Sequence, residues 1–184
     1  MPGAVVFGTA RWNARKRTGP AISSRAVAGK GELPTLRPRS GERSPSAVQK
    51  QVQELVVAAM RCAQAGDRSG EAIAYSNLGN AYYRLGQFDK AIEFHHKHLN
   101  IALGVGDRAG EGTAYGNLGN GYYSLGQFDK GIEFHHKRLN IALEVGDRAG
   151  EGRAYHNLFV AYGRLGQVDK ATEFQQKCET LRLK

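Results

Sequence analysis

Apolar residues recur every three or four positions through most of the chain after residue 46, the spacing that places them on one face of an α-helix. Gly86 and Gly126 interrupt this pattern, because glycine adopts the left-handed conformation that ends a helix at little cost. Asp107 follows another such glycine and is a favourable N-cap residue. The pattern therefore predicts seven helices, near residues 47–65, 69–85, 88–104, 109–125, 128–144, 149–165 and 168–183.

The sequence also repeats itself every 40 residues from Gly66. The second unit matches the first at 31 of 40 positions, and the third matches the second at 21 of 39. A fixed period of this length indicates stacked helix pairs, in which each unit contacts mainly its neighbours. We therefore predict an all-α fold, an α-solenoid of antiparallel helix pairs with about 3.5 repeats. The predicted parts are a half repeat with only its second helix at 47–65, then units at 66–105, 106–145 and 146–184.

Most of the positive charge precedes the helices. The chain has 26 Lys and Arg against 17 Asp and Glu, a net charge of +9. Residues 1–46 contain nine basic and two acidic residues, a net charge of +7, together with all five prolines. Their few apolar residues follow no period, so this segment cannot bury enough surface to offset the entropy of ordering it. We predict a disordered basic tail at 1–46.

Two functions for this tail compete with that of a plain solvated segment. The first 31 residues contain no acid and several Arg and Ser, as organelle transit peptides do, although Gly and Pro interrupt any amphipathic helix. The cluster Arg15-Lys16-Arg17 matches short nuclear or nucleic-acid contacts. Nucleic-acid binding would depend on the tail alone, and we do not expect it of residues 47–184, whose net charge is +2.

The composition argues against several other classes of protein. No apolar run approaches the roughly 20 residues that a membrane-spanning helix needs. Cys62 and Cys178 make no disulfide framework, which favours a reducing, cytoplasmic location. No glycine-rich phosphate loop, paired carboxylate site or Ser-His-Asp arrangement occurs. We therefore predict a protein that is no enzyme and uses no cofactor or small-molecule substrate.

The repeated residues resemble the tetratricopeptide repeat (TPR) family. The resemblance rests on residues that occupy the same positions in the first two units, namely Tyr75, Leu78, Gly79, Tyr82, Gly86, Phe88, Ala91 and Leu99, then Tyr115, Leu118, Gly119, Tyr122, Gly126, Phe128, Gly131 and Leu139. Common TPR units have 34 residues, and here six more extend the second helix. This 40-residue form resembles the TPRs of the Pins/LGN-type G-protein-signalling modulators.

The TPR resemblance implies that the first helices of the units line a concave groove that binds a partner protein. Spacings of 3, 7, 10 and 11 residues from Ile73 mark the stripe of the first helix that faces away from the core. We take the groove site from this stripe in the three units: Ile73, Ser76, Asn80, Tyr83, Arg84, Thr113, Asn120, Tyr123, Ser124, Arg153, His156 and Arg164. None is acidic, so we expect a neutral to positive groove that binds an extended acidic peptide.

The residue types in this stripe suit a peptide ligand. Asn80 and Asn120 each offer an amide donor and an acceptor, which together can hold an extended backbone without distinguishing its sequence. Tyr83 and Tyr123 add flat apolar contacts that carry a hydroxyl group, and arginines favour Glu or Asp. The alternative is that these side chains are solvated and bind nothing.

A groove that clamps a C-terminal carboxylate is not expected. TPRs of that kind resemble this chain at Asn80 and Asn120. They have Lys at the positions of Ser76 and His156, and Arg at that of Val160. The chain lacks all three cations. Pins/LGN-type grooves often carry Arg at the first position of the stripe, which only the third unit retains.

Histidines cluster in the predicted second helices, at His95-His96-x-His98 and His135-His136. A closed zinc site needs four converging ligands, whereas these residues recur once per unit along the array. His95 and His135 occupy a position that is usually aromatic and packed against a neighbouring helix. We therefore expect no metal site.

The two ends of the predicted array differ. The last helix is more polar than its equivalents, with Thr172, Gln175, Glu179 and Arg182 at otherwise apolar or histidine positions, as a capping helix needs to be. The helix at 47–65 carries apolar residues with no partner helix upstream. This leaves open an alternative function, in which the chain is a structural or self-associating fragment of a longer array with no groove ligand.

Overall fold

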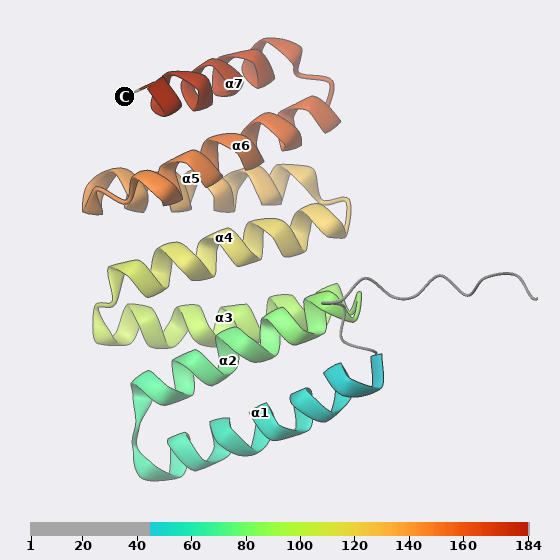
Figure 1. Ribbon diagram of the computed structural model, residues 1–184, viewed down its shortest axis with the longest axis vertical. Coiled ribbons are helices and arrows are strands. Elements are labelled where there is room, and N and C mark those ends of the chain that lie inside the picture. Colours follow the sequence, from blue (N-terminus) through green and yellow to red (C-terminus); the bar gives the residue numbers. More distant parts are fainter. Residues whose placement is uncertain (1–44, 184) are drawn as a thin grey trace, which may run out of the picture. The chain divides into compact units, whose positions relative to one another are not determined.

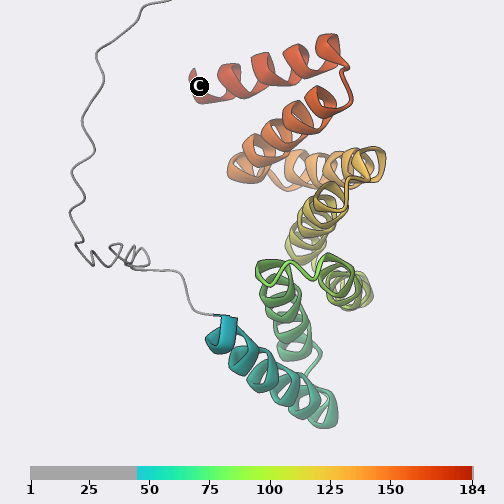
Figure 2. The same ribbon diagram turned by 90° about the vertical axis from the view of Figure 1, so that its right-hand side faces the viewer.

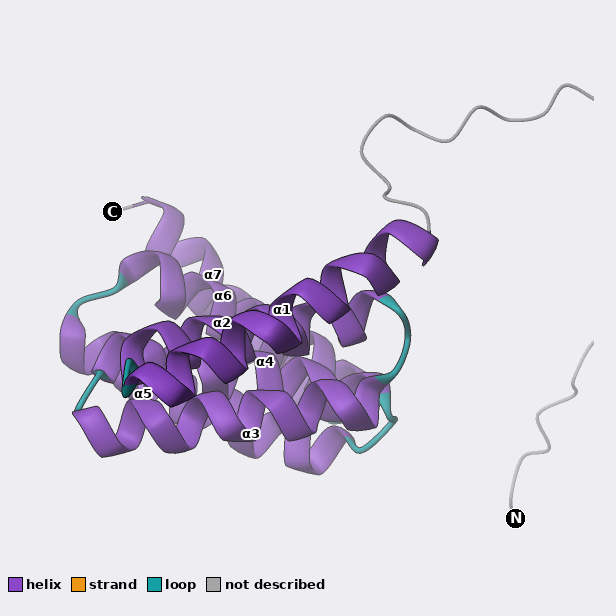
Figure 3. Ribbon diagram, turned by 90° about the horizontal axis from the view of Figure 1, so that it is seen from below, coloured by secondary structure: helices purple, strands orange, loops and turns teal. Residues whose placement is uncertain are grey.

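The computed structural model describes residues 45–183, and their regular structure is entirely α-helical. Seven helices follow one another: α1 (Pro45–Ala65), α2 (Arg68–Arg84), α3 (Phe88–Val105), α4 (Arg108–Ser124), α5 (Phe128–Val145), α6 (Arg148–Arg164) and α7 (Val168–Leu183). Each helix packs against the next in antiparallel order, and short loops join the neighbouring helix ends, alternately on one side of the stack and on the other (Figures 1 and 3). The predicted seven-helix solenoid is confirmed, and the helix bounds differ from the predicted ones by at most two residues.

The prediction of a disordered tail at 1–46 lies outside the described residues except at its end. There, Pro45 and Ser46 form the start of α1, two residues before the predicted start. Proline suits this position because the first backbone N–H of a helix has no partner within the helix and the proline ring already holds φ near its helical value.

A Gly-Asp pair both ends one unit and begins the next. Gly106 and Gly146 lie in the left-handed region, with φ of 70° and 72°. The following aspartates cap the next helices: Asp107 Oδ1 accepts a hydrogen bond of 2.9 Å from the backbone N–H of Gly110, and Asp147 does so at 2.8 Å from that of Gly150. The predicted capping role of Asp107 is confirmed, and the Gly-Asp pair recurs with the 40-residue period.

The core consists of three clusters, each centred on one leucine. Leu78, Leu118 and Leu158 are 1%, 0% and 0% exposed, and each belongs to a different cluster. In the middle cluster Leu118 of α4 packs against Ile92 and Leu99 of α3, which belong to the preceding unit. Burying a leucine contributes roughly 1.5–3 kcal/mol. These clusters therefore join each unit to the one before it.

Within each unit an aromatic pair joins the two helices. The rings of Tyr122 and Phe134 are stacked with centroids 5.3 Å apart and an interplanar angle of 1°. The equivalent pairs, Tyr82 with Phe94 and Tyr162 with Phe174, are also stacked. Because the same pair recurs in all three units, it fixes the angle between the first and second helices in the same way each time.

Histidine rings occupy the space that glycines leave in the first two units. The helix backbones approach each other closely at Gly119, because a Cβ added at Gly131 would lie 3.2 Å from the Gly119 carbonyl oxygen. The main occupants are nevertheless side chains, because a Cβ at Gly79 would lie 2.4 Å from the ring of His95, and one at Gly119 would lie 2.5 Å from that of His135. Each glycine is therefore required by the histidine opposite it.

Burial keeps these two histidines neutral. His95 and His135 are both 1% exposed. Desolvation lowers the pKa of each imidazole from 6.5 to about 4, and neighbouring cationic or histidine side chains act in the same direction. The sequence-based expectation that both side chains pack against a neighbouring helix holds for the described residues.

None of the helices in the described part of the chain has the length and apolar character needed to cross a membrane.

We expect Gly119→Ala to destabilise the protein by roughly 1–3 kcal/mol, because its Cβ would collide with the buried ring of His135. Gly104→Ala is the matched control, since a Cβ at this helical position meets open space. It should stabilise the protein by roughly 0.5–1 kcal/mol. Urea unfolding followed by circular dichroism measures both changes, and equal effects of the two substitutions would contradict the packing described.

We also expect the protein to lose stability in acid. The unfolded chain binds protons at histidine near pH 6.5, whereas the folded His95 and His135 bind them only near pH 4. Stability should therefore be full above pH 6.5 and fall as the pH decreases towards 4, by up to roughly 3 kcal/mol per histidine. Urea unfolding between these pH values should show a shallower loss for His95→Gln/His135→Gln. Substitution of an exposed residue that does not titrate, Asn100→Gln, should keep the wild-type slope.

Candidate functional site

The first helices of the three units line the inner side of the array. α2 contacts α4, and α4 contacts α6, whereas among the described helices α3 has no such contact with α5, nor α5 with α7. Because the first helices are closer together than the second helices, the stack curves towards α2, α4 and α6. We call their exposed stripe the inner face. Figure 2 shows the stack turned by 90° from the view of Figure 1.

Four of the twelve predicted site residues surround one depression on this face. Tyr83 of α2, Asn120 and Tyr123 of α4, and His156 of α6 line it together with Val160. The depression has a volume of about 200 Å³ and spans all three units. It therefore offers one continuous surface to a ligand that runs along the array.

Two more predicted residues meet in a second hollow nearer the start of α4 and α6. Thr113 and Arg153 line this hollow, which has a volume of about 170 Å³, together with Arg138 from α5 and Asp147. Arg153 lies 3.8 Å from the Asp147 carboxylate and keeps much of its side chain exposed. This second hollow therefore holds two arginines, Arg138 and Arg153, beside one acidic side chain, Asp147.

Hydrogen bonds between units hold much of the inner face in place. The hydroxyl groups of Tyr83 and Ser124 are 2.8 Å apart, and Arg164 Nε donates to the Tyr123 hydroxyl at 3.0 Å. Each bond joins one first helix to the next. Tyrosine side chains that the sequence assigned to a ligand thus also link consecutive units.

The two predicted asparagines differ in their surroundings. Asn120 Oδ1 accepts a hydrogen bond of 3.2 Å from Asn157 Nδ2, so one of the two acceptor positions of this oxygen is already occupied. Asn80 is exposed and has no side-chain hydrogen bond to the described residues. Asn80 therefore has its whole amide group available, whereas the oxygen of Asn120 is partly engaged by the next unit.

The six other predicted residues do not line these depressions, namely Asn80, Ser124 and Arg164, described above, and Ile73, Ser76 and Arg84. Ile73 is 60% exposed, and Ser76 is half-buried. Arg84 Nη2 donates to Gln51 of α1 at 3.0 Å, so its guanidinium group is turned towards the start of the array. These positions share the inner stripe but do not converge with the others.

Sequence analysis missed three residues at the inner face. Asn157 and His135 line the first depression, and Arg138 lines the second hollow. Asn157 had a signal, since asparagine occupies this position in all three units. The sequence signal for Arg138 was weaker, because the residue at this position differs in every unit, with His98 in the first and Cys178 in the third. Arg138 reaches the inner face from a second helix, which the helical stripe of a first helix cannot indicate.

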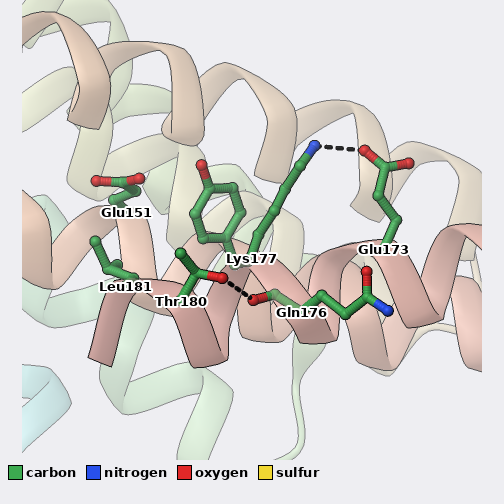
Figure 4. A pocket seen from close by; sticks show the side chains of 7 residues that line it. Glu151, Glu173, Gln176, Lys177, Thr180 and Leu181 are labelled. Atoms are coloured by element: carbon green, nitrogen blue, oxygen red, sulfur yellow. Dashed lines mark hydrogen bonds and ion pairs between the residues drawn. The ribbon is translucent and has the colours of Figure 1, made fainter. Parts of the chain in front are cut away.

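A further hollow lies between α6 and α7, where the described array ends (Figure 4). Glu151, Gln176 and Leu181 are among the residues that line it, and Lys177 pairs there with Glu173. Gln176 stands at the position of His136, which in the middle unit contacts the aromatic rings of the following unit. One lining residue of this hollow thus stands at a position that, in the middle unit, packs on the following unit.

No group of three or more potential metal ligands occurs within residues 45–183. In the second helices, burial lowers the pKa of His96 and His98 as well as that of His95. These histidines are packed in the interior or against aromatic rings.

Several solved structures are similar to this chain. BtubC (BKLC) from P. vanneervenii has a TM-score of 0.70 at 22% identity, over 75% of this chain and 57% of its own. The TPR domain of Arabidopsis FLU has a TM-score of 0.60 at 25% identity, over 63% of this chain and 97% of its own. A signal transduction ATPase with a tetratricopeptide repeat sensor from Pyrococcus horikoshii has a TM-score of 0.63 at 25% identity, over 74% of this chain and 21% of its own.

These similarities identify the fold, and the chain spans little more than half of the BtubC chain. No curated protein sequence matches it significantly. The tetratricopeptide repeat family model matches residues 70–130 and 110–184, which together are more than half of the sequence. The stacked helix pairs and this match lead to the same conclusion: the chain belongs to the tetratricopeptide repeat family.

Proposed function

We propose that this protein is an interaction scaffold whose inner face binds an extended, acidic peptide of a partner protein. The observation that carries the proposal is the depression shared by Tyr83, Asn120, Tyr123 and His156, which spans three units and contains no acidic side chain in its lining. Such a surface suits a ligand that lies along the array and contacts every unit.

The polar groups of this face support an extended ligand. Asn80 offers a free donor and acceptor, and the amide nitrogen of Asn120 is a free donor one unit later. A peptide backbone has both kinds of group at each residue. The inter-unit bonds of Tyr83 and Tyr123 hold the surface in place before the ligand arrives, which reduces the entropy lost on binding.

We further infer that the units run over 66–105, 106–145 and 146–184 after a half unit at 47–65, and that they belong to the Pins/LGN-like group. The six additional residues in each unit support this assignment. We infer an adaptor role in cytoplasmic signalling from the same resemblance.

The polar side chains of α7 at Thr172, Gln175 and Glu179 are exposed, which supports a capping role for this helix.

We expect a random peptide library, selected on the wild-type protein, to yield peptides enriched in Glu and Asp. Their binding, measured by fluorescence anisotropy, should weaken about tenfold or more in Asn80→Ala/Asn120→Ala, since each lost hydrogen bond contributes roughly 1 kcal/mol. Asn100→Ala/Asn140→Ala is the matched control, because these exposed asparagines lie on the second helices. Selected peptides that bind both double variants equally well would contradict the proposal.

Self-association is a second candidate function, favoured by an apolar surface on α1. Val57 and Met60 are 47% and 62% exposed, and a hollow of about 730 Å³ beside them is lined by Val52, Val56 and Tyr82, among others. Clustered apolar surface of this kind is typical of interaction sites.

This second function predicts a dimer at high protein concentration, which sedimentation velocity would detect. Val57→Lys should dissociate the dimer without disturbing the fold, because lysine occupies the equivalent position, residue 97, in the first unit. A wild-type protein that remains monomeric at every concentration would contradict it.

A further inference from the structure

The same hollow occurs in two units, but its lining differs. Between α4 and α5 it is lined by Gly112, Thr113 and Arg138. One period later, between α6 and α7, it is lined by Gly152, Arg153 and Cys178. Arg153 also borders the first of these hollows. The same cavity therefore recurs in the array, but one side chain that lines it differs, Arg138 in the first hollow and Cys178 in the second.

Two of the changes between the first and second units act together at Arg138. The first unit has Ser76 and a buried His98 where the second has Gly116 and Arg138. A Cβ at Gly116 would lie 2.0 Å from Nη1 of Arg138. The guanidinium group thus passes over Gly116, in space that any other residue would fill. Replacing Ser by Gly is what allows the arginine to reach the hollow.

The guanidinium group of Arg138 is largely unused by the protein. Its Nε donates a long hydrogen bond of 3.4 Å to the Gly150 carbonyl oxygen. Its two terminal nitrogens donate no hydrogen bond to residues 45–183. Burial, and then the positive charge of Arg153, lowers the pKa of this guanidinium, whereas the charge of Asp147 opposes the shift.

Asp147 does not neutralise the two arginines. Its Oδ1 caps α6 through the backbone N–H of Gly150 at 2.8 Å, and its other oxygen lies 3.8 Å from Arg153. Two guanidinium groups therefore share one carboxylate that is already engaged. A second carboxylate would satisfy the free donors of Arg138 with charge-assisted bonds, which are stronger than those between neutral groups.

We propose that Arg138, Arg153 and Thr113 form a subsite for the carboxylate of one Glu or Asp side chain on the bound peptide. The subsite rests on the proposed function, because its hollow opens on the inner face. Arg138 would donate from its two terminal nitrogens, Arg153 from its exposed guanidinium and Thr113 from its hydroxyl. The first and third units have His98 and Cys178 in place of Arg138, so the subsite occurs once and sets the position of the peptide along the array.

The test uses the full chain and a fluorescent peptide of alternating Glu and Ser, with a Gln-Ser peptide as its uncharged twin. The Arg138→His substitution introduces the residue that the first unit has at this position. Fluorescence anisotropy at low ionic strength should show that this variant binds the Glu peptide about tenfold more weakly than wild type does. Gly116→Ser should cause a similar loss with no change in charge, because its Cβ displaces the guanidinium group.

Two control variants accompany these. Lys137→Gln removes the same charge from an exposed neighbour that pairs with Glu133. Gly104→Ala also adds a Cβ at a helical glycine, where it meets open space instead of Arg138. Both should bind the Glu peptide like wild type, and circular dichroism should show wild-type helix content in all four variants. The basic tail is present in each, so differences between variants do not come from it.

The possible outcomes separate the two proposals. If Arg138→His and Gly116→Ser bind the Glu peptide as tightly as Lys137→Gln does, while Asn80→Ala/Asn120→Ala binds it more weakly, the subsite is wrong and the groove stands. If Asn80→Ala/Asn120→Ala also binds it like wild type, the groove is wrong as well. The Arg138 and Gly116 variants could also lose as much affinity for the Gln peptide as for the Glu peptide. This result would show that the substitutions act on packing, and it would also overturn the subsite.

Discussion

The burial of one leucine per unit is the interaction on which the rest of the structure depends. Leu78, Leu118 and Leu158 are almost completely enclosed, each within its own cluster. In the middle cluster, the leucine of α4 packs against residues of α3 in the unit before it. Because a helix turns about 100° per residue, fixing this side chain also fixes the direction of its neighbours. Asn80 and Tyr83, two and five positions after Leu78, consequently lie on the inner face.

The inner face is both a connection between units and a surface for a ligand. The bond between Tyr83 and Ser124 and that between Asn120 and Asn157 each join consecutive first helices. They hold the curvature of the array and at the same time occupy groups that a peptide could use. Asn80 is left free. Binding a peptide along this face would therefore depend on the spacing of the units as much as on the side chains themselves.

Near-identical units make small differences informative. The first two units share 31 of 40 residues, and two of the changes between them are paired in space. Gly116 and Arg138 replace Ser76 and His98, and the glycine provides the room that the arginine needs. The scaffold itself is preserved, since the leucine and the stacked Tyr-Phe pair recur in every unit. Specificity can thus change at one hollow without altering the stacking of the helices.

The sequence by itself determined the seven helices, their order and their ends. It could do so because an apolar period of three to four residues, a capping aspartate such as Asp107 and a left-handed glycine such as Gly106 are local signals, and because the 40-residue repeat shows that neighbouring units stack. It also identified the inner stripe, including Tyr83 and Asn120. Only the tertiary structure decided which side chains meet, such as the ring of His135 over Gly119 and Arg138 reaching the inner face from α5. Those pairings depend on the distance and rotation between helices of different units, which no periodicity within a single helix specifies.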